Sequence, residues 1–166
     1  MKALRQTVDL SAYPDLVVVY LGLSVNVLTG IKTLLGFGPK IEGSVAAGPD
    51  GLLLHENIFY SLYPLHVGMR QYWRDMDSLL AWTRSDPHRD WWKSFLKDSG
   101  GTGFWHETYL KTGGMEAIYD DIKQPIGFMR FAPVVPARGP MFAAAPRAGK
   151  GNGGEAVIAE NELYGE

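Results

Sequence analysis

The sequence predicts an α+β fold, in which a ferredoxin-like sheet carries helices on one face. Segments with the two-residue apolar period of strands alternate with segments of helical period, in the order βαββαββ. This order describes two βαβ units in series with one extra strand. The composition agrees, because 166 residues with 46% apolar and 20% charged side chains are typical of one soluble domain with a single core.

The first predicted strand and helix lie near the amino-terminal end. Asp15–Leu23 (DLVVVYLGL) is rich in β-branched residues, which favours a buried strand. A helix is expected over Thr29–Ala47, with its apolar positions on one face. Gly36, Gly38 and Pro39 predict a break or kink halfway along it. The turn sequence GPDG then ends the helix.

The remaining elements follow in quick succession. They are two strands, a pair of short helices and two more strands, at Leu52–Tyr60, His66–Arg74, Met76–Arg84, His88–Asp98, Gly103–Thr112 and Met115–Ile122. Gly113 and Gly114 separate the last two strands and predict a hairpin. A sheet with helices on one face leaves its other face open, so the sequence also predicts a two-fold homodimer that covers the open apolar face.

The composition changes near the carboxyl-terminal end. After Gln124 the chain holds five of its ten prolines, together with many glycines and alanines. Such a composition favours an extended arm over a second folded domain. We therefore expect a ferredoxin-like domain over residues 1–137 and a Pro/Gly/Ala-rich arm over residues 138–166.

Charge and cysteine content exclude several classes of function. The net charge of −2 gives no support for binding to nucleic acid or to an acidic membrane surface, since both need clustered Lys and Arg. The absence of cysteine excludes disulfides, iron–sulfur clusters, thiolate zinc sites and thiol nucleophiles, and it is consistent with a cytoplasmic protein. The longest apolar run, Leu16–Ile31, is shorter than the roughly 20 residues of a membrane span.

The dipeptide His-Glu occurs twice, but neither copy predicts a metal site. A zinc-protease helix needs a second histidine four residues after the first, and those positions hold Phe59 and Leu110. Both copies, which begin at His55 and His106, also lie in predicted strands. Adjacent side chains of a strand point to opposite faces, so a His and its neighbouring Glu cannot bind one ion.

Two histidines are candidates for chemistry. His106 shares the more apolar face of its strand with Phe104, and His88 shares a helix face with Trp91 and Trp92. Both are therefore expected between the helices and the sheet, where an imidazole can act as a base or as a ligand of a metal or haem. A hydrogen-bonded structural role is the alternative for each. The aromatic side chains either pack the core or line a pocket for a flat apolar ligand.

Four sequence blocks resemble a known family. QYWRDMDSLLAW (71–82), HRDWWKSF (88–95), GFWHETYLKTGGMEAIYDDI (103–122) and VVPA (134–137) are similar to the group of monooxygenases related to the Af470-type fungal enzyme. That group is similar in turn to the antibiotic-biosynthesis monooxygenases of the dimeric α+β-barrel superfamily. The resemblance covers about residues 16–137. It implies a ferredoxin-like subunit that forms a dimeric α+β barrel, with a cavity between sheet and helices.

The resemblance leaves the chemistry open among several classes. Some members of the superfamily are oxygenases that use no metal, flavin or haem. Others bind haem, including haem-degrading monooxygenases, chlorite dismutases and aldoxime dehydratases, and some have no known catalysis. Fold alone does not choose among these activities.

The leading hypothesis is a small cofactor-independent monooxygenase that oxidises an aromatic or polyketide-like metabolite. In it His106 or His88 removes a proton. The residues that match the family blocks, together with the more loosely matched Asn26, form the expected substrate site: Asn26, Tyr72, Trp73, Arg74, Trp105, Glu107 and Tyr109. The alternatives are a haem enzyme with His88 or His106 as axial ligand, and a non-catalytic ligand-binding or assembly protein. The expected partners are a small apolar or aromatic substrate and a second copy of the chain.

Overall fold

The structure, a computed structural model, describes residues 3–120, 122–123, 125, 127–149 and 159–164. The chain forms two compact units: Asp15–Leu110 make one, and Met1–Pro14 together with Lys111–Glu166 make the other. We call the first the ferredoxin-like unit and the second the terminal unit. The expected boundary after residue 137 falls inside the terminal unit.

The ferredoxin-like unit contains a four-stranded antiparallel sheet with strand order β3-β4-β2-β5. Its elements in chain order are β2 (Val17–Val25), α1 (Thr29–Ala46), β3 (Leu52–Ser61), β4 (His66–Trp73), α2 (Met76–Arg84), α3 (His88–Lys97) and β5 (Thr102–Leu110). The central strand β2 pairs with β4 on one side and with β5 on the other. This is the ferredoxin-like topology that the order of elements predicts.

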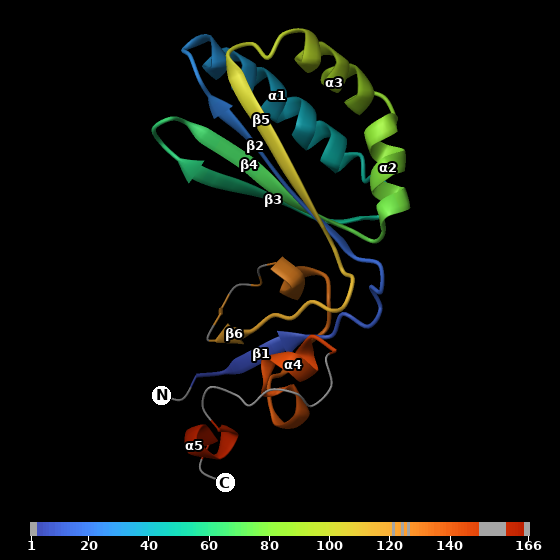
Figure 1. Cartoon of the computed structure of the whole chain (residues 1–166), viewed down its shortest axis with the longest axis vertical. Helices are drawn as coiled ribbons and strands as arrows, with labels where there is room; N and C mark the ends of the chain where they lie inside the picture. Colours follow the sequence, from blue (N-terminus) through green and yellow to red (C-terminus); the bar gives the residue numbers. More distant parts are fainter. Residues whose placement is uncertain (1–2, 121, 124, 126, 150–158, 165–166) are drawn as a thin grey trace. The chain divides into compact units, whose positions relative to one another are not determined.

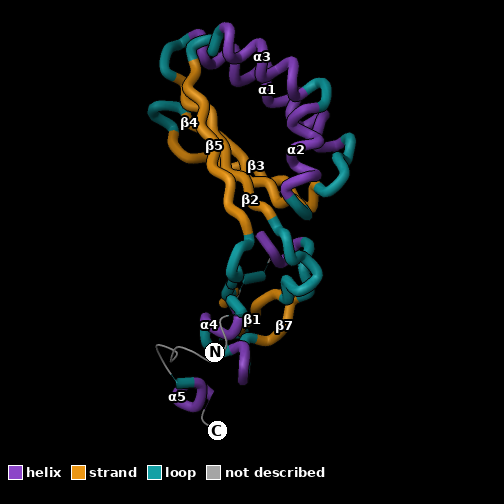
Figure 2. Tube along the Cα trace, turned by 45° about the vertical axis from the view of Figure 1, so that its right-hand side comes forward, coloured by secondary structure: helices purple, strands orange, loops and turns teal. Residues whose placement is uncertain are grey.

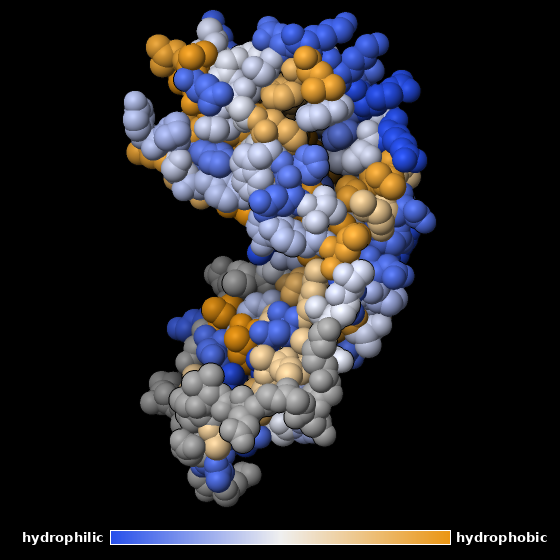
Figure 3. All heavy atoms as spheres, in the orientation of Figure 1, coloured by the Kyte–Doolittle hydropathy of each residue, from blue (hydrophilic) through white to orange (hydrophobic). Residues whose placement is uncertain are grey.

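All three helices of this unit cover the same face of the sheet (Figures 1 and 2). Every second residue of a strand points to that face. Val17, Val19 and Trp73 of the sheet form a buried cluster there with Leu79 of α2. Trp73 is fully buried. On the face of the molecule drawn in Figure 3, hydrophobic and hydrophilic side chains are mixed. Leu35 of α1 is among the exposed apolar residues.

The break expected in the first helix is absent. Helix α1 runs without interruption through Gly36, Gly38 and Pro39. A proline inside a helix has no N–H to donate to the residue four positions earlier, here Leu35. The helix therefore tolerates a missing hydrogen bond and two flexible glycines, and the prediction of a break was wrong.

The terminal unit contains a three-stranded antiparallel sheet of order β6-β1-β7. The strands and short helices of this unit are β1 (Arg5–Val8), β6 (Tyr119–Asp120), η1 (Gly127–Arg130), β7 (Val134–Pro136), η2 (Gly139–Met141), α4 (Ala144–Arg147) and α5 (Glu160–Tyr164). Around this sheet, the buried apolar residues of the unit are Val8, Leu10, Tyr119, Ala132, Ala137 and Phe142.

The hairpin expected at Gly113 and Gly114 does not form. Both glycines adopt positive φ angles, 89° and 104°, as a turn requires. Among the described residues of the expected strand Met115–Ile122, only Tyr119–Asp120 lie in a sheet, and they pair with β1 and not with β5. The last strand of the predicted βαββαββ order thus belongs to the other sheet.

No described helix is long and apolar enough to cross a lipid bilayer.

Candidate active site

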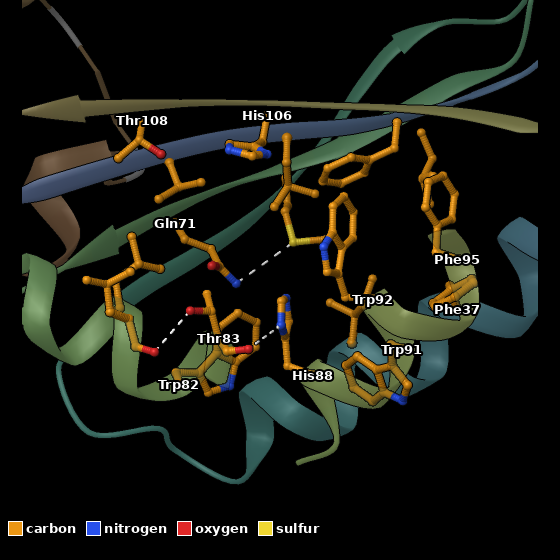
Figure 4. Close-up of a pocket in the computed structure, with 18 of the residues that line it drawn as sticks. Phe37, Gln71, Trp82, Thr83, His88, Trp91, Trp92, Phe95, His106 and Thr108 are labelled. Carbon is orange, nitrogen blue, oxygen red and sulfur yellow. Dashed lines mark hydrogen bonds between the residues drawn. The ribbon is translucent and has the colours of Figure 1, made fainter. Parts of the chain in front are cut away.

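A cavity of about 490 Å³ lies between the helices and the sheet of the ferredoxin-like unit. The strands provide its upper wall in Figure 4, and the helices provide the opposite wall. The lining is mostly apolar. Its aromatic members are Phe37, Trp82, Trp91, Trp92, Phe95 and Phe104, and its aliphatic members are Val19, Leu21, Leu23, Ile41, Met69, Met76, Leu79 and Leu80.

Five polar residues complete the lining: Gln71, Thr83, His88, His106 and Thr108. Among the described residues that line the cavity, none is an Asp, Glu, Lys or Arg. A charged ligand would lose its hydration here and find no opposite charge in return. The cavity therefore suits a neutral, largely aromatic molecule with few polar groups.

His88 is held in one tautomer by a hydrogen bond to the last turn of α2. Its Nδ1 lies 3.0 Å from the carbonyl oxygen of Thr83. A carbonyl oxygen only accepts, so Nδ1 carries the proton and Nε2 keeps its lone pair. Figure 4 shows the ring between the helix wall and the cavity. The Trp82 ring supports it from one side, with ring centroids 4.4 Å apart.

Burial lowers the pKa of His88 below its usual value, and the hydrogen bond to Thr83 only partly opposes this shift. The imidazole is consequently neutral near pH 7. A neutral imidazole with an accessible Nε2 lone pair can remove a proton from a ligand or bind a metal centre.

His106 reaches the same cavity from the sheet. It lies on β5 on the same face as Phe104 and Thr108, and the Phe104 and His106 rings pack with centroids 5.8 Å apart. The residue is exposed, whereas His88 is half-buried. The structure thus brings together the two histidines that the sequence singled out, one from each wall (Figure 4).

Gln71 is a lining residue that the sequence analysis did not identify. It lies on β4 between Met69 and Trp73, and it is only 1% exposed. The indole Nε1–H of Trp73 donates to Gln71 Oε1 at 3.1 Å, and Gln71 Nε2 lies 3.2 Å from His55 Nδ1. A glutamine among apolar neighbours on the helix-covered face of a strand is a signal that could have drawn attention to it.

Four of the expected substrate-binding residues point to the opposite, open face of the sheet. Tyr72, Trp105, Glu107 and Tyr109 alternate with the cavity-lining residues of β4 and β5, and none of the four lines the cavity. On the open face Trp105 Nε1–H donates to His66 Nε2 at 2.8 Å. The Tyr109 hydroxyl hydrogen-bonds to Glu107.

The other three expected residues also lie away from the cavity lining. Trp73 is buried in the core cluster of the sheet and α2, where its indole orients Gln71. Arg74 forms ion pairs with Asp50 and Asp75 at the exposed end of β4. Asn26 follows β2, and its backbone N–H donates to the carbonyl oxygen of Gly101 at 3.0 Å.

Metal binding finds no support in the described part of the chain. No three His, Cys, Asp or Glu side chains of those residues are grouped closely enough to hold an ion. The side chains of the first His-Glu copy point to opposite faces of the sheet: His55 meets Gln71, whereas Glu56 pairs with Arg70.

Sequence comparison connects the chain to a family. The family described as Monooxygenase af470-like matches residues 16–128, which is more than half of the chain. The matched range contains the whole ferredoxin-like unit except its first residue. A comparison with curated proteins finds no match.

Comparison with solved structures shows the fold. An aldoxime dehydratase matches with a TM-score of 0.63 and 20% identity over 80% of this chain and 39% of that one. A second aldoxime dehydratase, crystallised with butyraldoxime, matches with a TM-score of 0.64 and 21% identity. The match covers 80% of this chain and 38% of that one. The chain thus spans about two fifths of these enzymes. SnoaB, a cofactor-independent oxygenase from Streptomyces nogalater, matches with a TM-score of 0.45 and 10% identity. The match covers 57% of this chain and 91% of SnoaB.

Proposed function

The chain belongs to the af470-like monooxygenase family, and from this premise we propose that it oxidises a neutral aromatic or polyketide-like metabolite, without a cofactor, in the cavity between sheet and helices. One observation carries the proposal. The cavity combines apolar, aromatic walls with a neutral His88 whose Nε2 lone pair is available to a ligand.

The chemistry follows from a substrate that supplies its own electrons. His88 removes a proton from an activated C–H or O–H group, and His106 on the opposite wall is the second candidate base. The resulting anion is electron-rich and reduces O₂. In the overall reaction RH₂ + O₂ → R=O + H₂O, one oxygen atom enters the substrate, and the other leaves as water with the two hydrogens removed.

The apolar walls support this proposal in two ways. They offer aromatic side chains, Trp92 and Phe95, against which a flat ring can pack, and a bound ring displaces water from the space where the anion forms. The absence of charged side chains among the described lining residues also matches an uncharged substrate.

The test uses purified protein with a panel of hydroxylated naphthalenes and anthracenes under ¹⁸O₂. We expect oxygen consumption and a product that contains one ¹⁸O atom. His88→Ala or His106→Ala lowers the turnover by about 10²-fold or more, depending on which residue is the base. Ligands that bind the cavity without consuming oxygen, or products labelled from water, would contradict the proposal. Unchanged turnover in both variants would remove the histidines from the mechanism.

A haem enzyme on the same fold is the second candidate, and His88 favours it. A histidine whose Nδ1–H donates to a backbone carbonyl presents its Nε2 as an axial haem ligand does. The described lining fits less well, because it offers no cation to the two carboxylates of haem. Addition of haem followed by a visible spectrum separates the candidates: a Soret band that disappears in His88→Ala would support haem binding.

The open sheet face supports a homodimer as part of the same proposal. Tyr20, Tyr60, Trp105 and Tyr109 form an aromatic surface on the face that no helix of the unit covers. Sedimentation of the purified protein tests the dimer. We also assign the reaction to the cytoplasm, and the complete absence of cysteine supports a reducing compartment.

A further inference from the structure

The cavity contains a side-chain donor whose direction is fixed by its neighbours. Trp73 Nε1–H can only donate, so the atom of the Gln71 carboxamide that faces it at 3.1 Å is the oxygen. The amide nitrogen is therefore turned the other way. One of its N–H groups donates a hydrogen bond to Nδ1 of His55, and the two nitrogen atoms are 3.2 Å apart.

His55 completes this arrangement. Since His55 Nδ1 accepts from Gln71, its proton is on Nε2, which lies 3.1 Å from Asn57 Oδ1 and donates to it. Trp73, Gln71, His55 and Asn57 thus form a chain of hydrogen bonds with a single direction. This chain prevents the carboxamide from rotating.

The second hydrogen of Gln71 Nε2 has a weak partner. It faces the thioether sulfur of Met69 at 3.8 Å, on the cavity side of the sheet (Figure 4). A thioether is a poor acceptor, and a methionine side chain moves easily. Because Gln71 is only 1% exposed, this N–H is also nearly free of water. A ligand oxygen that displaces the sulfur gains a desolvated hydrogen bond.

We infer that Gln71 is a substrate-binding and anion-stabilising residue, which donates Nε2–H to a carbonyl or phenolic oxygen of the aromatic substrate. The inference deepens the proposed function and rests on it. It also narrows the substrate class to an aromatic ketone or phenol whose oxygen lies at Gln71 while its acidic hydrogen lies toward a cavity histidine.

The role differs from that of the residues first expected there. Asn26 and Arg74 are two of the expected substrate-binding residues with polar donors, and neither lines the cavity. Gln71 carries no charge, so it attracts a ligand oxygen without requiring a counter-ion. As the substrate loses its proton, negative charge grows on that oxygen, and a donor already in position stabilises it without reorganising.

The test compares 9-fluorenone with fluorene, two flat neutral ligands that differ in one carbonyl oxygen. Quenching of tryptophan fluorescence measures the affinity, because Trp82, Trp91 and Trp92 line the cavity. We expect the wild-type protein to bind fluorenone about three- to tenfold more tightly than fluorene, as one added hydrogen bond provides. The infrared C=O stretch of bound fluorenone should shift to lower frequency.

Two substitutions separate donation from folding. Gln71→Met fills the same space without polar atoms, but it leaves the Trp73 indole without an acceptor. Gln71→Glu keeps an oxygen for Trp73 and removes the donor while the carboxyl group is ionised. In both variants the preference for fluorenone should fall below twofold, and the C=O shift should disappear. Thr108→Val changes another polar lining residue and should retain both effects.

The outcomes distinguish this inference from the proposed function. Equal affinity for the two ligands in the wild-type protein, or a preference that survives in both folded Gln71 variants, would overturn the role of Gln71 alone. Failure of both ligands to bind the wild-type protein would overturn the cavity as a site for aromatic molecules, and this inference with it.

Discussion

His88 Nδ1 and the carbonyl oxygen of Thr83 lie 3.0 Å apart, and this hydrogen bond joins the end of α2 to the first residue of α3. The same contact fixes the tautomer of the histidine. One side chain therefore stabilises the junction of two helices and presents a lone pair to the cavity.

The first prediction concerns stability and pH. Burial lowers the pKa of His88 in the folded protein below the value of 6.5 that it has when exposed. Between the two pKa values the unfolded chain binds a proton that the folded chain does not, so the free energy of unfolding falls as the pH drops below about 6.5. Urea unfolding at pH values from 8 to 5 measures this loss of stability, which should be smaller in His88→Phe. If the free energy of unfolding depends on pH in the same way in both proteins, the prediction is wrong.

The second prediction concerns the indole of Trp73. Trp73→Phe removes the indole N–H that donates to Gln71 Oε1, and it leaves a space in a fully buried position. We expect a loss of about 3 kcal/mol in the free energy of unfolding. Trp92→Phe is the control, because Trp92 is 40% exposed and the loss there should be about 1 kcal/mol. Chemical denaturation of both variants provides the comparison, and equal losses would argue against a special role for Trp73.

The third prediction concerns the ion pair on the open sheet face. Arg70 Nη2 lies 2.6 Å from Glu56 Oε2, and Arg70 Nη1–H also donates to the Tyr20 hydroxyl at 2.9 Å. Both side chains of the pair are largely buried, so Glu56→Gln should lower the free energy of unfolding by about 2 kcal/mol.

The matched control is an exposed pair. Arg89 and Asp86 are both 64% exposed, and Asp86→Asn should change the free energy of unfolding by less than about 0.5 kcal/mol. The two variants are compared by urea denaturation at low and high salt. A similar small effect at both sites would mean that the Arg70 pair is no stronger than a surface pair.

The fourth prediction contrasts two glycines. A Cβ on Gly68 would lie 2.1 Å from the backbone carbonyl oxygen of Leu21, which the sheet holds in place, whereas a Cβ on Gly36 would meet nothing within 4 Å. Gly68→Ala should therefore lower the free energy of unfolding by about 2 kcal/mol or more. Gly36→Ala should raise it by about 0.5–1 kcal/mol, because alanine favours the helix. Thermal denaturation shows whether each substitution raises or lowers the stability. A loss of stability in Gly36→Ala would contradict the expectation that alanine favours helix α1 at this position.

The sequence predicts the ferredoxin-like unit well because its signals are local. Alternation along Val17–Val25 and Thr102–Leu110 determines which side chains face the helices, and it correctly assigns His106 to the cavity side. The same period assigns Trp105 and Glu107 to the other face. They were expected to bind substrate because they lie in the block GFWHETYLKTGGMEAIYDDI that resembles the family, and a match to a block does not say which face a side chain occupies.

The missed features depend on distant parts of the chain. The glycines at 113 and 114 make a turn, but the strand after them finds its partner in Arg5–Val8, more than a hundred residues away. No local pattern selects that partner over β5. Gln71 was missed for a similar reason, since its role depends on Trp73, His55 and the helices that form the opposite wall of the cavity.

The charge-free lining makes the cavity a filter for ionisation state as well as for shape. A phenol that has already lost its proton in solution must abandon its hydration at the entrance, whereas the protonated phenol enters at little cost. The fraction of ligand that can bind therefore depends on the acidity of the ligand and on the pH outside.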